Sequence, residues 1–290
     1  MGNTAKTAFL LTLLTVLFIW IGGHFDGRNG MILGLLFAAG INFFTYFYSD
    51  KLALKMYRAQ PVTREELPRA YEVVERMTQK MGLPMPKMYV IPTDSPNAFA
   101  TGRNPKHASV AMTQGILALL NDEELEGVLA HELGHVRNRD ILTSSIAATL
   151  AGAIVLIARM GYWASLFGGY GGGQGSRDRE GGGVGALLML ILAPIAATLI
   201  QLAVSRAREY EADATGARTT GNPYALASAL EKIDAYSKRL PLVASPTTAH
   251  LFIAQPFTGR EIFANLFSTH PPMAKRIERL IGRRSLSGLE

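Results

Sequence analysis

Four long apolar runs constrain the fold of this chain more than any other feature of its sequence. They cover about residues 7–22, 31–48, 141–158 and 184–204. A helix that crosses a bilayer needs about 20 predominantly apolar residues, with a range of roughly 17 to 25. Hydrophobic residues make up 48% of the chain and charged residues 18%. This balance favours a mostly α-helical membrane protein with about four transmembrane helices.

Two alternatives to this interpretation stay open. The third and fourth runs could form a pair of buried core helices, although they are longer than most core helices. The first run could be a cleaved signal peptide, because Lys6 precedes it as a basic flank. However, the second run follows the first closely, and this arrangement is more typical of a helical hairpin.

Basic residues near the ends of the runs indicate the orientation in the membrane. Lys and Arg accumulate on the cytoplasmic side of membrane proteins, and here they mark one side: Lys6, Lys51, Lys55, Arg58, Arg137, Arg139, Arg206 and Arg208. The loops on the other side balance their basic residues with acidic ones. We therefore expect a multi-pass protein of the plasma (inner) membrane with both termini in the cytoplasm. The formal charge of +6 then reflects topology rather than nucleic-acid binding.

The apolar runs divide the chain into four parts. Residues 1–50 are expected to form an N-terminal transmembrane hairpin, and residues 141–205 a second hairpin with a flexible Gly-rich outer loop. The polar segments 51–140 and 206–290 are expected to form the two parts of one cytoplasmic domain. Within the latter, residues 240–268 show no clear period and stay unassigned.

Local signals place helices and short strands within the polar segments. Thr63 and Glu66 stand at capping-box spacing and predict a helix that closes on Gly82. Asn121, followed by three acidic residues, predicts the cap of a second helix. Further elements are expected where cap or turn residues flank a patterned run: strands at KMYVI and ASVAM, a helix from Asn222, and a helix over 271–284.

His131, Glu132 and His135 form an HExxH motif on the second of these helices. Positions four apart project from one helix face, so the two histidines can hold one ion, while Glu132 reaches a ligand of that ion. Zinc in hydrolases takes three protein ligands and a water, whose proton a nearby carboxylate accepts. With six His and 15 Glu in 290 residues, chance produces the motif about 0.006 times.

The third metal ligand must come from beyond the fourth apolar run. The chain has no cysteine, so the ligand is His, Glu or Asp. A metzincin would need a histidine at the position of Ile141. The next acids on the cytoplasmic side are Glu209, Glu211 and Asp213. On a helix Glu209 and Asp213 share a face while Glu211 points away, so one of the two can ligate and the other can support a ligand histidine.

Four motifs together give the chain a family resemblance: NAFATG, AHELGHVRNRD, SRAREYEADA and THPP. They resemble those of the HtpX-type membrane metallopeptidases, which are heat-shock quality-control proteases of the gluzincin type related to the CAAX prenyl endopeptidases. The resemblance extends from the first apolar run to the last helix. It implies a zincin-like catalytic domain with a small β-sheet and one Zn²⁺ per chain.

The resemblance also assigns residue roles. It implies that His131, His135 and Glu209 hold the zinc, that Glu132 is the general base, and that Asp213 supports a ligand histidine. His270 would help to hold the transition state, although a histidine before proline is often only a helix cap. The NAFATG run would be a strand that lines the substrate cleft, which places these residues there: Asn97, Ala98, Phe99, Ala100 and Thr101.

The function implied is an endopeptidase that degrades unfolded or damaged membrane proteins from the cytoplasmic side, under stress. The alternative is a non-catalytic zinc-binding adaptor or scaffold in the membrane, but such a protein needs no carboxylate at Glu132. Prenyl-protein processing would be expected to need more spans around a chamber. The expected partners are the bilayer and such substrates, with no nucleic acid. The sequence leaves the oligomeric state and the cleavage preference open.

Overall fold

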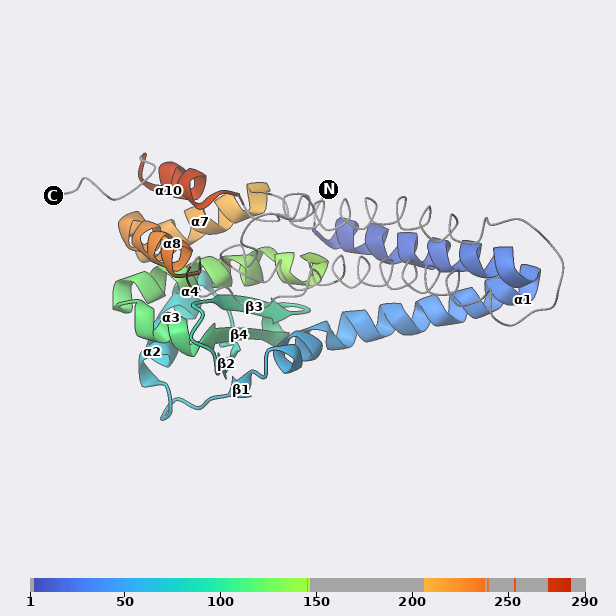
Figure 1. Ribbon diagram of the computed structural model, residues 1–290, viewed down its shortest axis with the longest axis horizontal. Helices are drawn as coiled ribbons and strands as arrows, with labels where there is room; N and C mark the ends of the chain where they lie inside the picture. The colour runs from blue at the N-terminus through green and yellow to red at the C-terminus, as the bar shows by residue number, and fades with distance from the viewer. Residues whose placement is uncertain are drawn as a thin grey trace, which may run out of the picture.

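The computed structural model describes residues 3–144, 146, 206–237, 239, 253 and 271–282. The described residues form an elongated molecule in which a helical hairpin projects from a rounded body of helices and a sheet (Figure 1). His270, the Gly-rich loop and nearly all of the expected third and fourth spans lie outside the described residues.

The projecting hairpin is α1 (Asn3–Met56), whose helical geometry breaks at Asp26 and Gly27. Gly27 has φ 48° and ψ −128°, a conformation that glycine adopts readily. The two arms run antiparallel and approach closely, since a Cβ on Gly22 would lie 2.0 Å from the carbonyl oxygen of Gly30. Glycine allows such backbone contact between membrane helices. The hairpin expected from the first two apolar runs is therefore present, and its second arm continues past residue 50.

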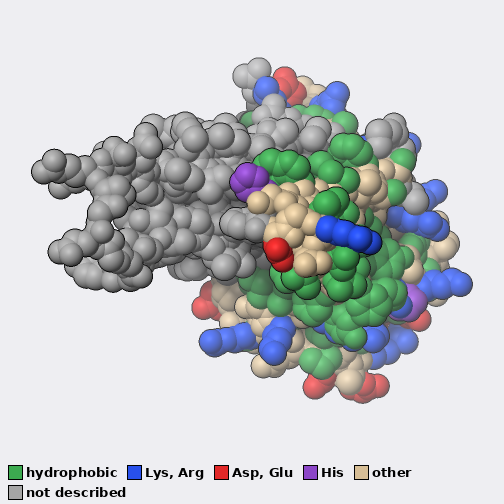
Figure 2. Space-filling view, turned by 90° about the vertical axis from the view of Figure 1, so that its right-hand side faces the viewer, with side chains coloured by type: hydrophobic (Ala, Val, Ile, Leu, Met, Phe, Trp, Pro, Cys, Tyr) green, Lys and Arg blue, Asp and Glu red, His purple; other side chains and the backbone are tan. Residues whose placement is uncertain are grey.

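Both arms of α1 have the length and composition of membrane-spanning helices. Ala5–His24 and Asp26–Met56 are each long and apolar enough to cross a membrane. Large hydrophobic side chains on these arms are exposed, among them Phe9, Trp20, Leu33, Leu36 and Phe43. Seen from the tip of the hairpin, hydrophobic side chains dominate the described part of this face, and most Lys and Arg side chains lie towards its rim (Figure 2). Such a surface suits lipid contact.

A four-stranded mixed sheet lies at the base of the hairpin, in the order β1-β2-β4-β3. Its strands are β1 (Gln60–Pro61), β2 (Lys87–Ile91), β3 (Ala98–Gly102) and β4 (Ala108–Thr113), with a short 3₁₀ turn η1 (Pro105–His107) before β4. β2 and β4 pair in parallel, and the other two pairs are antiparallel. The strands predicted at KMYVI and ASVAM are confirmed, and the NAFATG run contributes the edge strand β3.

The two faces of the sheet contact different parts of the molecule. Side chains on one face, including Ala100 and Val110, belong to the main core with α2 and α4. On the other face, Phe99 packs with Leu54 of α1 and lies edge-to-face with Tyr57, with ring centroids 5.9 Å apart. The base of the apolar hairpin is thus fixed to the strand that the sequence predicts at the substrate cleft.

The described residues contain six further helices, of which the last three pack against α4 or one another rather than against the sheet: α2 (Pro68–Met81), α3 (Gln114–Leu119), α4 (Asp122–Asn138), α7 (Arg206–Thr220), α8 (Pro223–Ser237) and α10 (Met273–Ile281). The caps predicted at Asn121 and Asn222 are confirmed, because their side chains accept the backbone N–H of Glu124 and Ala225. The helix end at Gly82 is also confirmed, with a left-handed φ of 65°.

The predicted start of α2 at Thr63 is wrong. Glu66 does accept the backbone N–H of Thr63, at 2.7 Å, as one half of a capping box would. However, the helix begins at Pro68, because proline disfavours the α conformation of the residue before it and fits the first helical position itself. Leu67 accordingly has φ −138° and ψ 59°.

Candidate metal centre and active site

The packing of α7 against α4 brings the two halves of the candidate site together. Small residues allow this approach. A Cβ on Gly216 of α7 would lie 3.1 Å from the backbone nitrogen of His131, and one on Gly134 of α4 would lie 3.5 Å from the Cα of Ala212. Gly216 and Asp213 are three positions apart and therefore share the face of α7 that meets α4.

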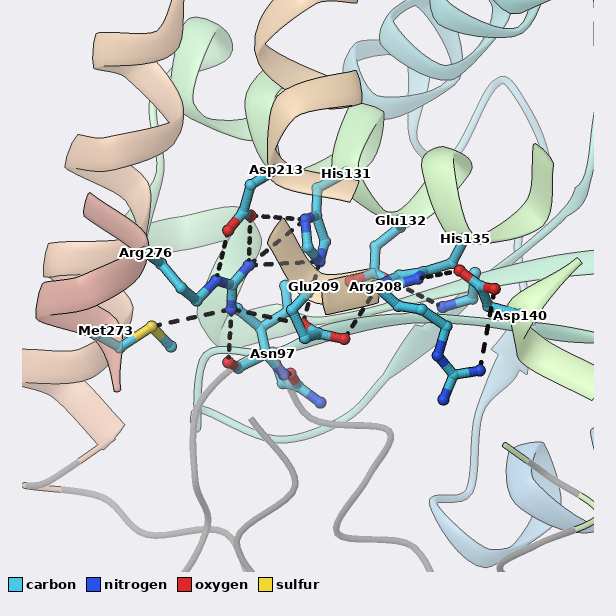
Figure 3. A network of polar contacts seen from close by, with 12 residues as sticks. Asn97, His131, Glu132, His135, Asp140, Arg208, Glu209, Asp213, Met273 and Arg276 are labelled. Atoms are coloured by element: carbon cyan, nitrogen blue, oxygen red, sulfur yellow. Dashed lines mark hydrogen bonds and ion pairs between the residues drawn. The ribbon is translucent and has the colours of Figure 1, made fainter. Parts of the chain in front are cut away.

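His131, His135 and Glu209 form a group of side chains that could hold a metal ion, with His131 and Glu209 buried and His135 half-buried. Their ligand atoms all lie within 4.8 Å of one another. The Nε2 atoms of His131 and His135 lie 3.8 and 3.5 Å from the carboxylate oxygens of Glu209, and the two imidazole rings are perpendicular (Figure 3). Two imidazoles and one carboxylate match the donor set of a catalytic zinc site, which leaves a fourth position for water.

Each histidine directs its other ring nitrogen at a carboxylate. The Nδ1 of His131 lies 2.9 Å from Asp213, and that of His135 lies 3.3 Å from Asp140. A carboxylate in this position fixes the tautomer and the orientation of a metal-binding imidazole. Burial lowers the pKa of His135, but the negative charges of Glu209 and Asp140 outweigh it and raise this pKa to about 9. The excess of carboxylates therefore favours a bound cation.

Asp140 was not assigned from the sequence, although it closes the same motif as the histidines. Arg139 ends α4 in the left-handed conformation, with φ 57°, and its N–H contacts the carbonyls of His135 and Val136. The chain is helical again over residues 140–144. This sharp turn directs Asp140 back towards the end of α4, where it also lies 3.9 Å from Arg208. In a sequence, glycine indicates that the backbone can adopt the left-handed conformation, but arginine gives no such indication.

Glu132 lies beside the metal group without belonging to it. Its Oε2 accepts the backbone N–H of Ala100 at 2.9 Å, so β3 fixes the position of this carboxylate. Glu132 is 5% exposed, and burial raises the pKa of its carboxyl against the lowering effect of His131 and His135. A carboxylate next to a metal group, with its pKa shifted towards neutrality, suits a general base.

Arg276 is the main site residue that the sequence did not reveal. This fully buried arginine of α10 donates Nε and Nη2 to Asp213, at 2.9 and 2.7 Å, and its Nη1 lies 3.9 Å from Glu209. Burial would raise the pKa of Asp213, but the charge and hydrogen bonds of Arg276 lower it to about 2. The available signal was its position beside the apolar stripe of α10, between Met273 and Ile277.

The structure places the remaining expected residues as follows. Ala98, Ala100 and Thr101 are buried in β3, whereas the ring of Phe99 faces α1. The side chain of Asn97 is buried and its Oδ1 accepts the N–H of Ile253. Glu211 is exposed on α7, away from the group that Glu209 and Asp213 enter.

The fold and the site define a metal-dependent hydrolase with an HExxH helix. The profile of peptidase family M48 matches residues 65–284. The chain belongs to this family and is a metallopeptidase, which confirms the resemblance found in the sequence.

Several curated relatives cover nearly the whole chain. A protease HtpX homolog from Desulfatibacillum aliphaticivorans is 54% identical over 288 residues, which are 99% of this chain and 92% of the relative. A protease HtpX homolog from Thermococcus sibiricus is 52% identical over 281 residues, 97% of this chain and 96% of the relative. The crystal structure of S. mikatae Ste24p has a similar fold, with a TM-score of 0.53 and 19% identity, and the match covers 94% of this chain and 62% of that one.

Proposed function

We propose that this metallopeptidase is an integral-membrane endopeptidase with one zinc ion, held by His131, His135 and Glu209. The observation that carries the proposal is the convergence of these three side chains within 4.8 Å, with Glu132 beside them but outside the ligand group. Nitrogen and carboxylate ligands in this number are typical of catalytic zinc.

The protein groups around the metal have distinct roles in the proposed mechanism. Bound zinc would lower the pKa of a water and polarise the peptide carbonyl. Glu132, held by the amide of Ala100, accepts the proton of the attacking water and returns it to the leaving amine. Asp213 and Asp140 contact the Nδ1 atoms of the histidines and would so leave their Nε2 atoms free to bind the zinc. We carry over from the family resemblance that His270 helps to hold the transition state.

We further propose that the substrates are unfolded or damaged membrane proteins, in a quality-control role. Support comes from the contact between the apolar hairpin and β3, because this contact keeps the site near the base of α1. The proposal includes four spans, with the site, both termini and the segments 51–140 and 206–290 in the cytoplasm. It follows the distribution of Lys and Arg along the chain.

The test uses the full-length protein in detergent, loaded with Zn²⁺ and incubated with unfolded casein. Glu132→Gln should keep its zinc and lose nearly all cleavage, because the change removes the base and not a ligand. Glu123→Gln is the matched control, because Glu123 is an exposed glutamate on the same helix and about two turns away from His131. Its carboxylate accepts a hydrogen bond from Asn222 and takes no part in the metal group. An active Glu132→Gln protein would refute the mechanism. A native protein that binds zinc but cleaves neither casein nor an unfolded membrane protein would favour the adaptor alternative.

A further inference from the structure

The backbone of Ile253 is held at both of its polar groups by side chains of the candidate site. Its N–H donates to Asn97 Oδ1 at 3.0 Å, and its carbonyl oxygen accepts from Arg276 Nη1 at 3.3 Å. Buried backbone groups are usually paired within helices and sheets. Here a carboxamide and a guanidinium bond the N–H and the C=O of a single residue that lies in a bend of the chain. Hydrogen bonds to backbone groups are also how proteins hold a bound peptide.

The side chain of Ile253 occupies an apolar environment. It is 3% exposed and belongs to the main hydrophobic core. A charged side chain in the same place would lose its hydration in this apolar core, and the nearby guanidinium of Arg276 is already paired with Asp213. The place that Ile253 fills therefore accepts an aliphatic residue and rejects a charged one.

Both groups that hold Ile253 are connected to the metal ligands. The same Nη1 atom of Arg276 that contacts Ile253 lies 3.9 Å from Glu209, and the rest of its guanidinium binds Asp213. Asn97 immediately precedes β3, the strand whose Ala100 amide holds Glu132. A residue bound between these two side chains therefore lies beside the metal centre.

The side chain of Asn97 is held in place and has a hydrogen-bond donor available for a ligand. Its backbone N–H and C=O both bond to Thr113, which fixes the position of its side chain. Asn97 is 3% exposed, and within the described part of the chain its Nδ2 donor has no hydrogen-bond partner. A buried amide donor of this kind is costly unless a ligand accepts from it. A peptide substrate would bring further carbonyl groups to this position.

We propose that Ile253 occupies the place of one substrate residue. Asn97 and Arg276 form a subsite for the backbone of one peptide residue, the apolar surroundings select an aliphatic side chain, and the chain's own isoleucine competes with substrate for this subsite. The proposal deepens the proposed peptidase function, on which it rests, by naming the preferred residue and a self-inhibitory contact. If Ile253 fills the subsite nine-tenths of the time, it weakens substrate binding about tenfold.

The test measures peptide binding rather than cleavage, so it is independent of turnover. The probe is a fluorescent peptide with the sequence of residues 249–257, AHLFIAQPF. It is titrated, with anisotropy as the readout, into the full-length, zinc-loaded Glu132→Gln protein, which should not cut it. Ile253→Ala in this protein should tighten binding about tenfold, because alanine fills the subsite poorly, and Ile253→Val should leave binding unchanged.

Two controls separate competition from loss of packing. Ile233→Ala removes the same atoms from the same core in α8, and it should not tighten binding. When Asn97→Ala is added to Ile253→Ala, the protein should again bind the peptide as weakly as the parent Glu132→Gln protein does. The proposal would be overturned if the Ile253→Ala protein and its parent bound the peptide equally. It would also be overturned if adding Asn97→Ala to the Ile253→Ala protein left the peptide affinity unchanged.

A second probe keeps the test decisive if Ile253→Ala fails to fold. A peptide with Asp in place of its isoleucine should bind the Glu132→Gln protein, with Ile253 unchanged, at least tenfold more weakly than the parent peptide. Equal binding of the two peptides would refute the subsite. Cleavage by the Glu132→Gln protein would instead refute the mechanism proposed above and leave the peptide comparison valid.

Discussion

Gly216→Ala should weaken metal binding through the spacing of two helices, without changing any ligand side chain. The added methyl group would lie 3.1 Å from the backbone nitrogen of His131 and 3.4 Å from the carbonyl oxygen of Gly127. These are backbone atoms of α4, which cannot move aside as a flexible side chain can. The strain is relieved when α7 moves a few tenths of an ångström away from α4, and Glu209 and Asp213 move with it.

The magnitude follows from two opposing terms. Overpacking of this kind costs about 1–3 kcal/mol, while alanine in place of glycine within a helix contributes about 1 kcal/mol of stability. The free energy of unfolding of the metal-free protein should therefore fall by at most about 2 kcal/mol. The helix propensity of alanine does not offset the loss of metal affinity, because it is the same with and without metal. Metal–ligand bonds of about 2.0–2.2 Å, in contrast, pull the two helices back together and restore the strain. The metal affinity should fall at most about 140-fold, set by the part of the roughly 1–3 kcal/mol that the metal-free protein avoids through this movement.

The assay is a titration of metal-free protein with Zn²⁺ against a chromogenic chelator, beside thermal unfolding of the same samples. Gly134→Ala is the matched control at the same helix interface, because its methyl group would meet Ala212 and Thr215 at ordinary contact distances of 3.5–3.6 Å. It should gain stability and keep its zinc affinity. Equal zinc affinities for the two variants would show that the α4–α7 distance does not set the geometry of the metal centre.

Three other predictions concern single positions. Glu209→Ala should lose bound metal, whereas Glu211→Ala should keep it, because only the former side chain enters the metal group; metal analysis of both purified proteins decides this. Asp140→Asn should bind zinc about 10 to 100-fold more weakly while unfolding at a similar temperature, if this carboxylate orients the second histidine ligand; unchanged affinity would contradict that role. Ser176→Cys should react with a membrane-impermeant thiol reagent in intact cells, and Ala235→Cys, exposed on α8, only after lysis; labelling of both from one side would exclude a crossing pair of helices between them.

The parts of the site that the sequence predicted are those that local geometry determines. His131, Glu132 and His135 lie on one helix, so their spacing alone defines which face they share. The cap at Asn121 is equally local. For Glu209 and Asp213, helix periodicity showed that both face the same way, but the choice between them depends on where α7 crosses α4. That crossing is set by contacts such as that of Gly216, which no sequence pattern on α7 reveals.

Arg276 and Ile253 escaped prediction because their positions depend on distant parts of the chain, whereas Asp140 escaped it because of an unusual local turn. Asp140 reaches His135 through a left-handed turn at an arginine, a residue type that gives no signal of it. The periodicity of α10 placed Arg276 next to an apolar stripe, yet it could not show which helix that stripe would contact. The start of α2 was wrong for the opposite reason, since a local signal at Thr63 was overruled by an equally local proline.

The division of the site between α4, α7 and α10 also determines when during synthesis the enzyme can become active. A nascent chain that has emerged only as far as α4 carries both histidines and Glu132, but no third ligand. Once α7 has been translated Glu209 is available, yet Asp213 remains a buried carboxylate without the arginine that neutralises it until α10, the last described helix, leaves the ribosome. A chain that stops before α10 therefore has the three candidate ligands but lacks the arginine that balances Asp213, the carboxylate that contacts His131.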